Sequence, residues 1–153
     1  MRRKASRDEI EVLRAIAAFQ WDWNVAFSLF PEGEEFSVDI RRGRVRYVIL
    51  EGRVYLTLRP NDGLFSVSIP AAERIVSSTV PPRFRLVVRG DREIRGSILA
   101  RDIVGIDPGL RPGDEVVIVD KEDSLIGVGR LRVPVNMMEG LVYGEVARVR
   151  SRV

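Results

Sequence analysis

The N-terminal part of the chain begins with a helical pattern of apolar residues. These residues recur at spacings of three and four from Ile10 to Phe19, which is typical of one face of an amphipathic helix. Just before them, Ser6 and Glu9 have the S-x-x-E spacing of a capping box. The sequence therefore predicts a helix over residues 7–19.

Two shorter helices are expected in the same part of the chain. One precedes the turn that begins at Pro31, and the other covers residues 71–76, with Pro70 in the first-turn position that proline tolerates. Trp21 and Trp23 flank the start of the first of these helices. Because large aromatic side chains dominate burial energetics, we expect both tryptophans in the core.

Between these helices the apolar period changes from helical spacing to two. Alternating segments separated by glycine-containing turns predict strands, which cover residues 36–40, 45–49, 54–58 and 64–69. Helices combined with an antiparallel meander form an α+β domain. Residues 77–82, with the sequence SSTVPP, have the small, polar and proline-rich character of a linker. We therefore expect an α+β domain over residues 1–80 and a second domain over residues 81–153.

The second domain is predicted to be a small barrel. Short apolar segments recur between turn signals, as in small barrels and sandwiches. The expected strands cover residues 83–89, 103–104, 116–119, 125–128 and 145–150, and Ile98-Leu99 suits a single helical turn. Gly127 and Gly129 stand inside a strand pattern, which favours a bend of the barrel over a phosphate-binding loop.

Composition excludes several kinds of chemistry. The 153 residues include no cysteine and no histidine. Disulfides, thiolate metal sites, cysteine nucleophiles and imidazole acid–base catalysis are therefore excluded. No apolar run approaches the roughly 18 residues needed to cross a bilayer, so we expect a cytoplasmic protein. The acidic residues near 114 and 120–123 are expected to be solvated, and we predict neither a metal nor a cofactor.

The cationic residues are almost all arginine. Of 25 basic residues only Lys4 and Lys121 are lysine, which leaves 25 − 2 = 23 arginines. Arginine pairs bidentately with phosphate and stacks on bases. An arginine-biased genome or a thermophilic origin would produce the same bias, and many of the arginines stand near acidic residues with which they can pair.

Period two places arginines on one face of several predicted strands. Arg83, Arg85 and Arg89 share the face opposite Phe84, Leu86 and Val88, and the arrangement repeats in the pairs 130/132 and 148/150. If the strands share a sheet, these guanidinium groups can follow a phosphate backbone. They can equally form the solvated side of a barrel, and the pattern alone does not separate the two interpretations.

Residues 96–150 resemble a PUA domain, a small pseudo-barrel of RNA-modifying and ribosome-assembly proteins. The matching segments are GSILAR at 96–101, Asp107, LRPGDEV at 110–116, GVGR at 127–130 and GEVARV at 144–149. The resemblance implies RNA binding through Gly96, Ser97, Ile98, Leu99, Ala100 and Arg101, which form a short helix beside the RNA groove in that family. Strand periodicity adds Arg83, Arg85, Arg130 and Arg148 as candidates.

Upstream segments extend this likeness to the C-terminal region of archaeal tRNA-guanine transglycosylase, which starts archaeosine formation in tRNA. They are LRAIAAFQ at 13–20, Leu29-Phe30, GRVR at 43–46, LTLRPNDGL at 56–64 and PRFR at 82–85. In that family the PUA domain holds the tRNA acceptor end, and the preceding domain helps remodel the tRNA. The catalytic barrel of the family, with its aspartates and zinc site, has no counterpart here, and residues 21–24 replace a glycine-bearing stretch.

Together these patterns predict an α+β fold class: helices on an antiparallel sheet, followed by a PUA-type pseudo-barrel. The expected function is binding of structured RNA, above all tRNA, as a non-catalytic subunit or accessory factor beside a catalytic tRNA-modification enzyme. Two alternatives remain at this point: a ribosome-assembly factor that binds ribosomal RNA, since another family of small proteins also ends in a PUA domain, and a protein-interaction module that has lost RNA binding.

Overall fold

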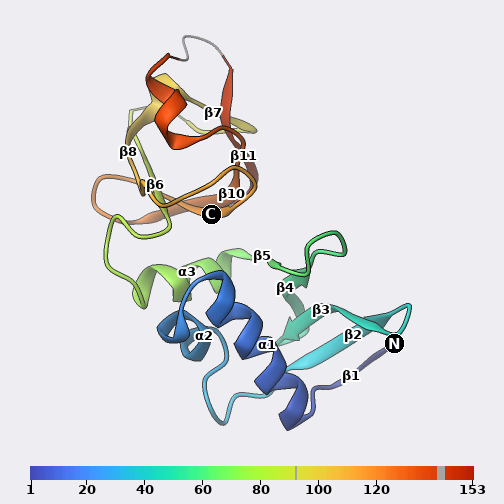
Figure 1. Ribbon diagram of the computed structural model, residues 1–153. Coiled ribbons are helices and arrows are strands. Elements are labelled where there is room, and N and C mark those ends of the chain that lie inside the picture. Colours follow the sequence, from blue (N-terminus) through green and yellow to red (C-terminus); the bar gives the residue numbers. More distant parts are fainter. Residues whose placement is uncertain (92, 141–143) are drawn as a thin grey trace. The chain divides into compact units, whose positions relative to one another are not determined.

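The helices of the first part of the chain form where side chains cap their first turns. In the computed structural model, which describes residues 1–91, 93–140 and 144–153 (Figure 1), α1 (Arg7–Gln20) starts at the predicted capping box. The Ser6 hydroxyl accepts from the Glu9 amide at 3.1 Å, and the Glu9 carboxylate accepts from the Ser6 amide at 2.8 Å. Side-chain caps at Asp22 and Ser68 begin α2 (Trp23–Leu29) and α3 (Ile69–Ser77). The three predicted helices are confirmed.

Residues Met1–Ser78 form one unit and Thr79–Val153 a second. The first contains a five-stranded antiparallel sheet in the order β1-β2-β3-β4-β5. Its strands are β1 (Arg2–Lys4), β2 (Ser37–Arg41), β3 (Arg44–Leu50), β4 (Arg53–Leu58) and β5 (Phe65–Val67). Strand β1 was not predicted, because three consecutive basic residues carry no alternation; it forms by pairing with β2.

Aromatic side chains fill the interior of this first unit. Phe30 is fully buried, with its ring centroid 5.1 Å from that of Phe36 and 6.3 Å from that of Tyr55. Trp21 is also buried, at 8% exposed, and stacks parallel to Phe65. Trp23 is 59% exposed, so the prediction of a buried tryptophan pair is correct for Trp21 and wrong for Trp23. As the first residue of α2, Trp23 lies on the solvent side of that short helix.

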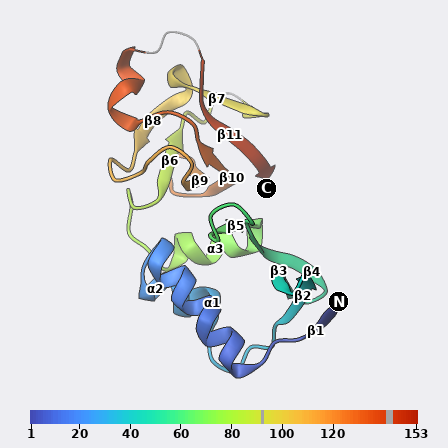
Figure 2. The same cartoon turned by 45° about the vertical axis from the view of Figure 1, so that its right-hand side comes forward.

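The second unit is a curled, mixed six-stranded sheet in the order β7-β11-β10-β9-β6-β8. Its strands are β6 (Arg85–Val88), β7 (Ser97–Leu99), β8 (Ile103–Ile106), β9 (Glu115–Val119), β10 (Leu125–Leu131) and β11 (Glu145–Arg152). Only β6 and β9 pair in parallel among the described strands. Figure 2 shows the strands curling around a common interior.

The helical turns of this unit differ from the sequence prediction by a few residues. The turn expected at Ile98-Leu99 lies at η1 (Ala100–Asp102), while Ile98 and Leu99 belong to β7. The shift follows from Asp102, whose carboxylate accepts from the Leu99 amide at 2.9 Å and closes the turn after the strand. A second short helix, η2 (Val135–Gly140), follows β10. Among the described residues, no helix is long and apolar enough to cross a membrane.

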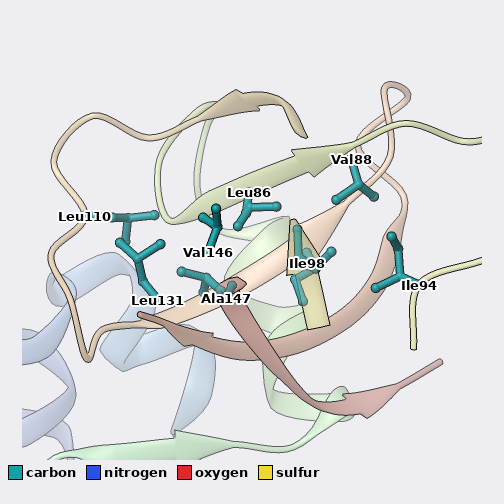
Figure 3. Packing of buried hydrophobic residues seen from close by; sticks show 10 residues of the cluster. Leu86, Val88, Ile94, Ile98, Leu110, Leu131, Val146 and Ala147 are labelled. Carbon is teal, nitrogen blue, oxygen red and sulfur yellow. The ribbon is translucent and has the colours of Figure 1, made fainter. Parts of the chain in front are cut away.

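The curled sheet closes around one apolar cluster. Leu86, Ile98 and Leu131, from three different strands, are fully buried and point toward a common centre (Figure 3). The cluster is completed by further side chains from β6, β9, β11 and the turns, namely Val88, Ile94, Leu110, Val116, Ile118, Val146 and Ala147. Burial of this kind stabilises a fold by about 25 cal/mol for each Å² of apolar surface removed from water.

Glycines let β10 and β11 approach closely where the sheet bends. The pairing of these strands shifts register between Val128 and Gly129. A Cβ atom placed on Gly129 would lie 2.1 Å from the carbonyl oxygen of Arg148, and one on Gly127 would lie 2.6 Å from that of Ser151. The obstacles are backbone atoms, which cannot swing aside, so the bend predicted at these glycines depends on the missing side chains.

We predict that Gly129→Ala destabilises the protein by roughly 3 kcal/mol, since overpacking against backbone forces the strands apart. The matched control is Gly90→Ala, because a Cβ atom at Gly90 meets nothing within 4 Å; its effect should stay within about 0.5 kcal/mol. Urea unfolding of both variants measures the difference. Equal midpoints for the two variants would contradict the proposed role of the close approach.

Candidate nucleic-acid interface

The structure brings three of the predicted site residues into one cross-strand row. Ser97 on β7 lies opposite Arg148 on β11, and Arg148 lies opposite Arg130 on β10. Directly paired residues of antiparallel strands project from the same face of a sheet. The interior neighbours Ile98 and Leu131 are buried, while the Arg148 side chain is 64% exposed. The row Ser97–Arg148–Arg130 therefore lies on the outer face of the barrel.

Glu145 organises one end of this row. Its carboxylate accepts from the Ser97 hydroxyl and from the Arg148 guanidinium at 3.2 Å, and it lies 4.0 Å from Arg132. The Ser97 hydroxyl, and after it the Arg148 guanidinium, lower the pKa of Glu145 below its ordinary range. The carboxylate therefore stays ionised and orients the two donors. Sequence reasoning missed Glu145 as a site residue, although it is part of the GEVARV segment.

The segment Gly96–Arg101 divides between the core and the surface. Ile98 is fully buried, whereas Gly96, Ser97 and Arg101 are exposed. A Cβ atom built on Gly96 would meet no atom within 4 Å, so the space in front of this residue is open. The Arg101 carbonyl accepts from the Arg89 side chain at 2.8 Å. Within the described ranges, no residue pairs with the Arg101 guanidinium.

Arg130 extends the row toward a turn. Its Nε donates to the carbonyl of Gly113 at 3.2 Å, which connects it to the turn before β9. The same turn contains Arg111, which is exposed and whose guanidinium has no partner in the part of the chain described. Arg111 was not among the predicted residues, because nothing in the sequence places that turn beside Arg130.

Arg85 is not exposed on the predicted arginine face. The expectation that Arg83, Arg85 and Arg89 share one exposed strand surface is wrong, because Arg85 has 0% exposure. Its guanidinium donates to both carboxylate oxygens of Asp123 at 2.9 Å. Leu86 and Val88 face the apolar cluster, so Arg85 still lies on the opposite face of β6 as the alternation predicts. It is buried because Asp123 and Thr79, which both accept hydrogen bonds from its guanidinium, cover that face. Arg83 stays exposed, 4.9 Å above the Phe84 ring.

The carboxylates near residues 114–123 have structural roles. Glu115 is buried and binds the Arg150 guanidinium at 2.5 Å, and Asp123 binds Arg85. Asp120 closes the β9–β10 turn by accepting from the amides of Glu122 and Ser124, both at 2.9 Å. Among the described residues, no group of three or more acidic side chains could hold a metal ion.

Two family models match the chain, one in each unit. Residues 11–82 match the patch-forming domain C2 of tRNA-guanine transglycosylase, and residues 88–153 match the PUA domain. A tRNA-guanine(15) transglycosylase of Pyrococcus abyssi is 32% identical over 92% of this chain, and one of Korarchaeum cryptofilum is 37% identical over 80%. The chain spans only 24% and 21% of the length of these curated relatives.

Solved structures share the fold at low sequence identity. A hypothetical protein from Pyrococcus horikoshii superposes with a TM-score of 0.70 at 15% identity, covering 99% of this chain and 94% of that one. A conserved PUA domain protein from Thermoplasma acidophilum superposes with a TM-score of 0.65 at 18% identity, covering 99% and 93%. Both extend over the helices and sheets of this chain, so the predicted fold class is confirmed.

We predict that Asp123→Asn destabilises the protein by about 2 kcal/mol, because the buried Arg85 charge loses its counter-ion. This loss of stability is smaller than the usual cost of breaking a buried ion pair, because the Asp123 side chain is 33% exposed. Asparagine, like aspartate, adopts a positive φ readily, so the substitution does not strain the backbone at this position, where φ is 61°. Asp91→Asn, at an exposed carboxylate, is the control. Equal thermal unfolding of the two variants would argue against a structural role for Arg85.

Proposed function

Because the chain is a PUA-domain protein that resembles the C-terminal region of archaeal tRNA-guanine transglycosylase, we propose that it binds structured RNA, with tRNA as its ligand. It acts as a non-catalytic subunit or accessory factor in tRNA modification, beside a catalytic polypeptide. One observation carries the proposal. Residues 88–153 match the PUA domain, and within them strand pairing brings Ser97, Arg148 and Arg130 into one row on an outer face. We propose that the exposed residues of the segment Gly96–Arg101 complete this RNA-binding surface.

The electrostatics of this face suit a phosphate backbone. The Arg101 guanidinium has no partner among the described residues, so a phosphate does not have to displace an existing ion pair. Arg148 is bound to Glu145 through one nitrogen, which leaves further donors of the guanidinium fork available. Arg130 uses Nε for the Gly113 carbonyl. Guanidinium groups bind phosphate in bidentate geometry and release counter-ions.

Gly96 and Ser97 suit the approach of an RNA backbone. The open space in front of Gly96 means that the fold itself does not need a glycine there. A missing side chain lets a ligand backbone come close, and the neighbouring amides are then accessible as donors. Ser97 presents its hydroxyl on the same edge strand, oriented by Glu145. Arg83 is exposed, and we include it in the proposed surface, whereas the burial of Arg85 excludes that residue.

The choice of tRNA rests on the relatives. The curated proteins that match the chain are named tRNA-guanine(15) transglycosylases, and 92% of this chain aligns with the one from Pyrococcus abyssi. The aligned part is about a quarter of that protein. We therefore assign to this chain the holding of tRNA, and assign the transfer reaction to a catalytic polypeptide.

The test is a titration of the protein with a tRNA transcript at several salt concentrations. Arg101→Glu should weaken binding about tenfold or more and lower the salt slope by about one, as expected for the loss of a phosphate contact. Lys121→Glu is the matched control, with the same change in charge at an exposed position in the β9–β10 turn. It should bind within about twofold of the wild type, because surface charges away from the contact have small effects.

A second transcript without its 3′ CCA end separates tRNA from other structured RNA. We expect weaker binding of the truncated transcript, since an acceptor-end contact would be lost. Equal affinity for both transcripts would contradict tRNA acceptor-end recognition and favour ribosomal RNA. Affinity that does not depend on salt, or that is equal for Arg101→Glu and the wild type, would contradict RNA binding at this face.

A further inference from the structure

The first unit contains an apolar groove that the RNA proposal does not use. The groove has a volume of about 1270 Å³ and lies between α1 and strands β3 and β4. Val12, Leu13 and Ile16 line it from the helix, and Val45 and Leu58 line it from the strands. Val12 is 60% exposed, and Ile16, Val45 and Leu58 are partly exposed, whereas Leu13 is buried beneath them. A contiguous aliphatic surface open to solvent marks an interaction site more often than a chance exposure.

The helix side of the groove has the shape of a helix-packing surface. Glu9, Val12, Leu13 and Ile16 recur at spacings of three and four, so they form one face of α1. From residue 8 to residue 16 this face extends about 12 Å along the axis, which is the length of about two helical turns. Ridges of this kind pack against the grooves of a second helix.

Arginines surround the apolar floor. Arg41, Arg42, Arg44, Arg46 and Arg59 line the groove. Two of them are compensated, because Arg41 lies 3.3 Å from Asp39 and Arg59 lies 2.8 Å from Asp62. The guanidinium groups of Arg42, Arg44 and Arg46 form no ion pair with any described residue. The rim therefore carries uncompensated positive charge.

Arg46 differs from Arg42 and Arg44 in its accessibility. Its Nε is buried and has no hydrogen-bond partner among the described residues, so a ligand in the groove does not reach this atom. Arg42 and Arg44 are exposed, and their guanidinium groups are the ones that a ligand can contact.

The acidic residues of the groove do not neutralise this rim. Glu9 is bound by both terminal nitrogens of Arg3, at 2.6 and 2.8 Å. These bonds, followed by the Ser6 amide, lower the pKa of Glu9 to about 2. The negative charge of Glu9 is therefore compensated by Arg3, and Glu9 does not neutralise the arginines of the rim. Asp8 is the remaining carboxylate that lines the groove.

The chemistry of the floor favours a polypeptide over RNA. RNA-binding grooves combine basic residues with aromatic platforms on which bases stack. Here the floor is aliphatic, and the aromatic ring of the groove belongs to Tyr47. Arg41 and Arg46 already lie over this ring, at 6.0 and 5.8 Å from its centroid. A base would have to displace a cation–π contact, whereas an aliphatic helix face would not.

We propose that this groove binds an acidic amphipathic α-helix of a partner protein. The apolar face of that helix packs on Val12 and Ile16, and its flanking carboxylates pair with Arg42 and Arg44. This is the helix-in-groove mode of recognition, with apolar anchors for affinity and charge complementarity for selection of the partner.

The probe is a synthetic 18-residue helical peptide with a leucine stripe flanked by glutamates, and its counterpart with lysines in place of the glutamates. Fluorescence anisotropy with the full chain should show saturable binding of the glutamate peptide and at least about tenfold weaker binding of the lysine peptide. Arg42→Glu and Val12→Asp should each weaken the glutamate peptide about tenfold, because each removes one element of the recognition.

Matched controls come from the start of β4. Arg53→Glu and Val54→Asp introduce the same changes at exposed positions of the same unit that do not line the groove, and both should bind the glutamate peptide like the wild type. Arg101→Glu should also leave peptide binding unchanged, so a failure of RNA binding and a failure of this proposal remain distinguishable. Circular dichroism confirms that each variant is folded.

Three results would overturn the proposal. They are the absence of saturable binding of the glutamate peptide, equal binding of both peptides, and unchanged binding by Arg42→Glu and Val12→Asp. If those two variants lose affinity for a tRNA transcript while peptide binding is unchanged, the groove is a nucleic-acid site.

Discussion

The outer face of the second unit depends on the close approach of β10 and β11. At Gly129 the strands are so near that a single Cβ atom would overlap the carbonyl of Arg148. This approach allows the sheet to bend around its apolar cluster, and it keeps Arg130 opposite Arg148. The exposed Arg148 and the partly exposed Arg130 are thus placed by a backbone contact. A change that separates the strands would therefore disturb the core and the candidate interface together.

The many arginines of the chain divide into structural and available groups. Arg85 and Arg150 bind buried or partly buried carboxylates, and removal of either partner would leave an unpaired charge inside the protein. Arg101, Arg42 and Arg44 have no ion pair with the described residues. A net charge of +3 therefore understates the local positive charge, because the uncompensated arginines gather on particular surfaces of each unit.

Local sequence patterns predicted most helices and strands, from the helical spacing of apolar residues in α1 to the continuous apolar run that forms β9. They failed where a long-range contact decides the outcome. Strand β1 exists through pairing with β2, more than thirty residues away, and Arg85 is buried through its contact with Asp123, 38 residues away. The row of Ser97, Arg148 and Arg130 needed the register of three strands. The groove of the first unit is lined by residues of α1, β3 and β4, and no local sequence pattern predicts that these elements lie side by side.

The central claim is that RNA lies across the face formed by Gly96–Arg101, Arg130 and Arg148. Ultraviolet crosslinking of the complex with a tRNA transcript, followed by mass spectrometry of the attached peptides, locates the contact directly. The account predicts crosslinks within residues 96–101 and on the outer side of β10 and β11. Crosslinks confined to the first unit, or to the β9–β10 turn at Lys121, would contradict it.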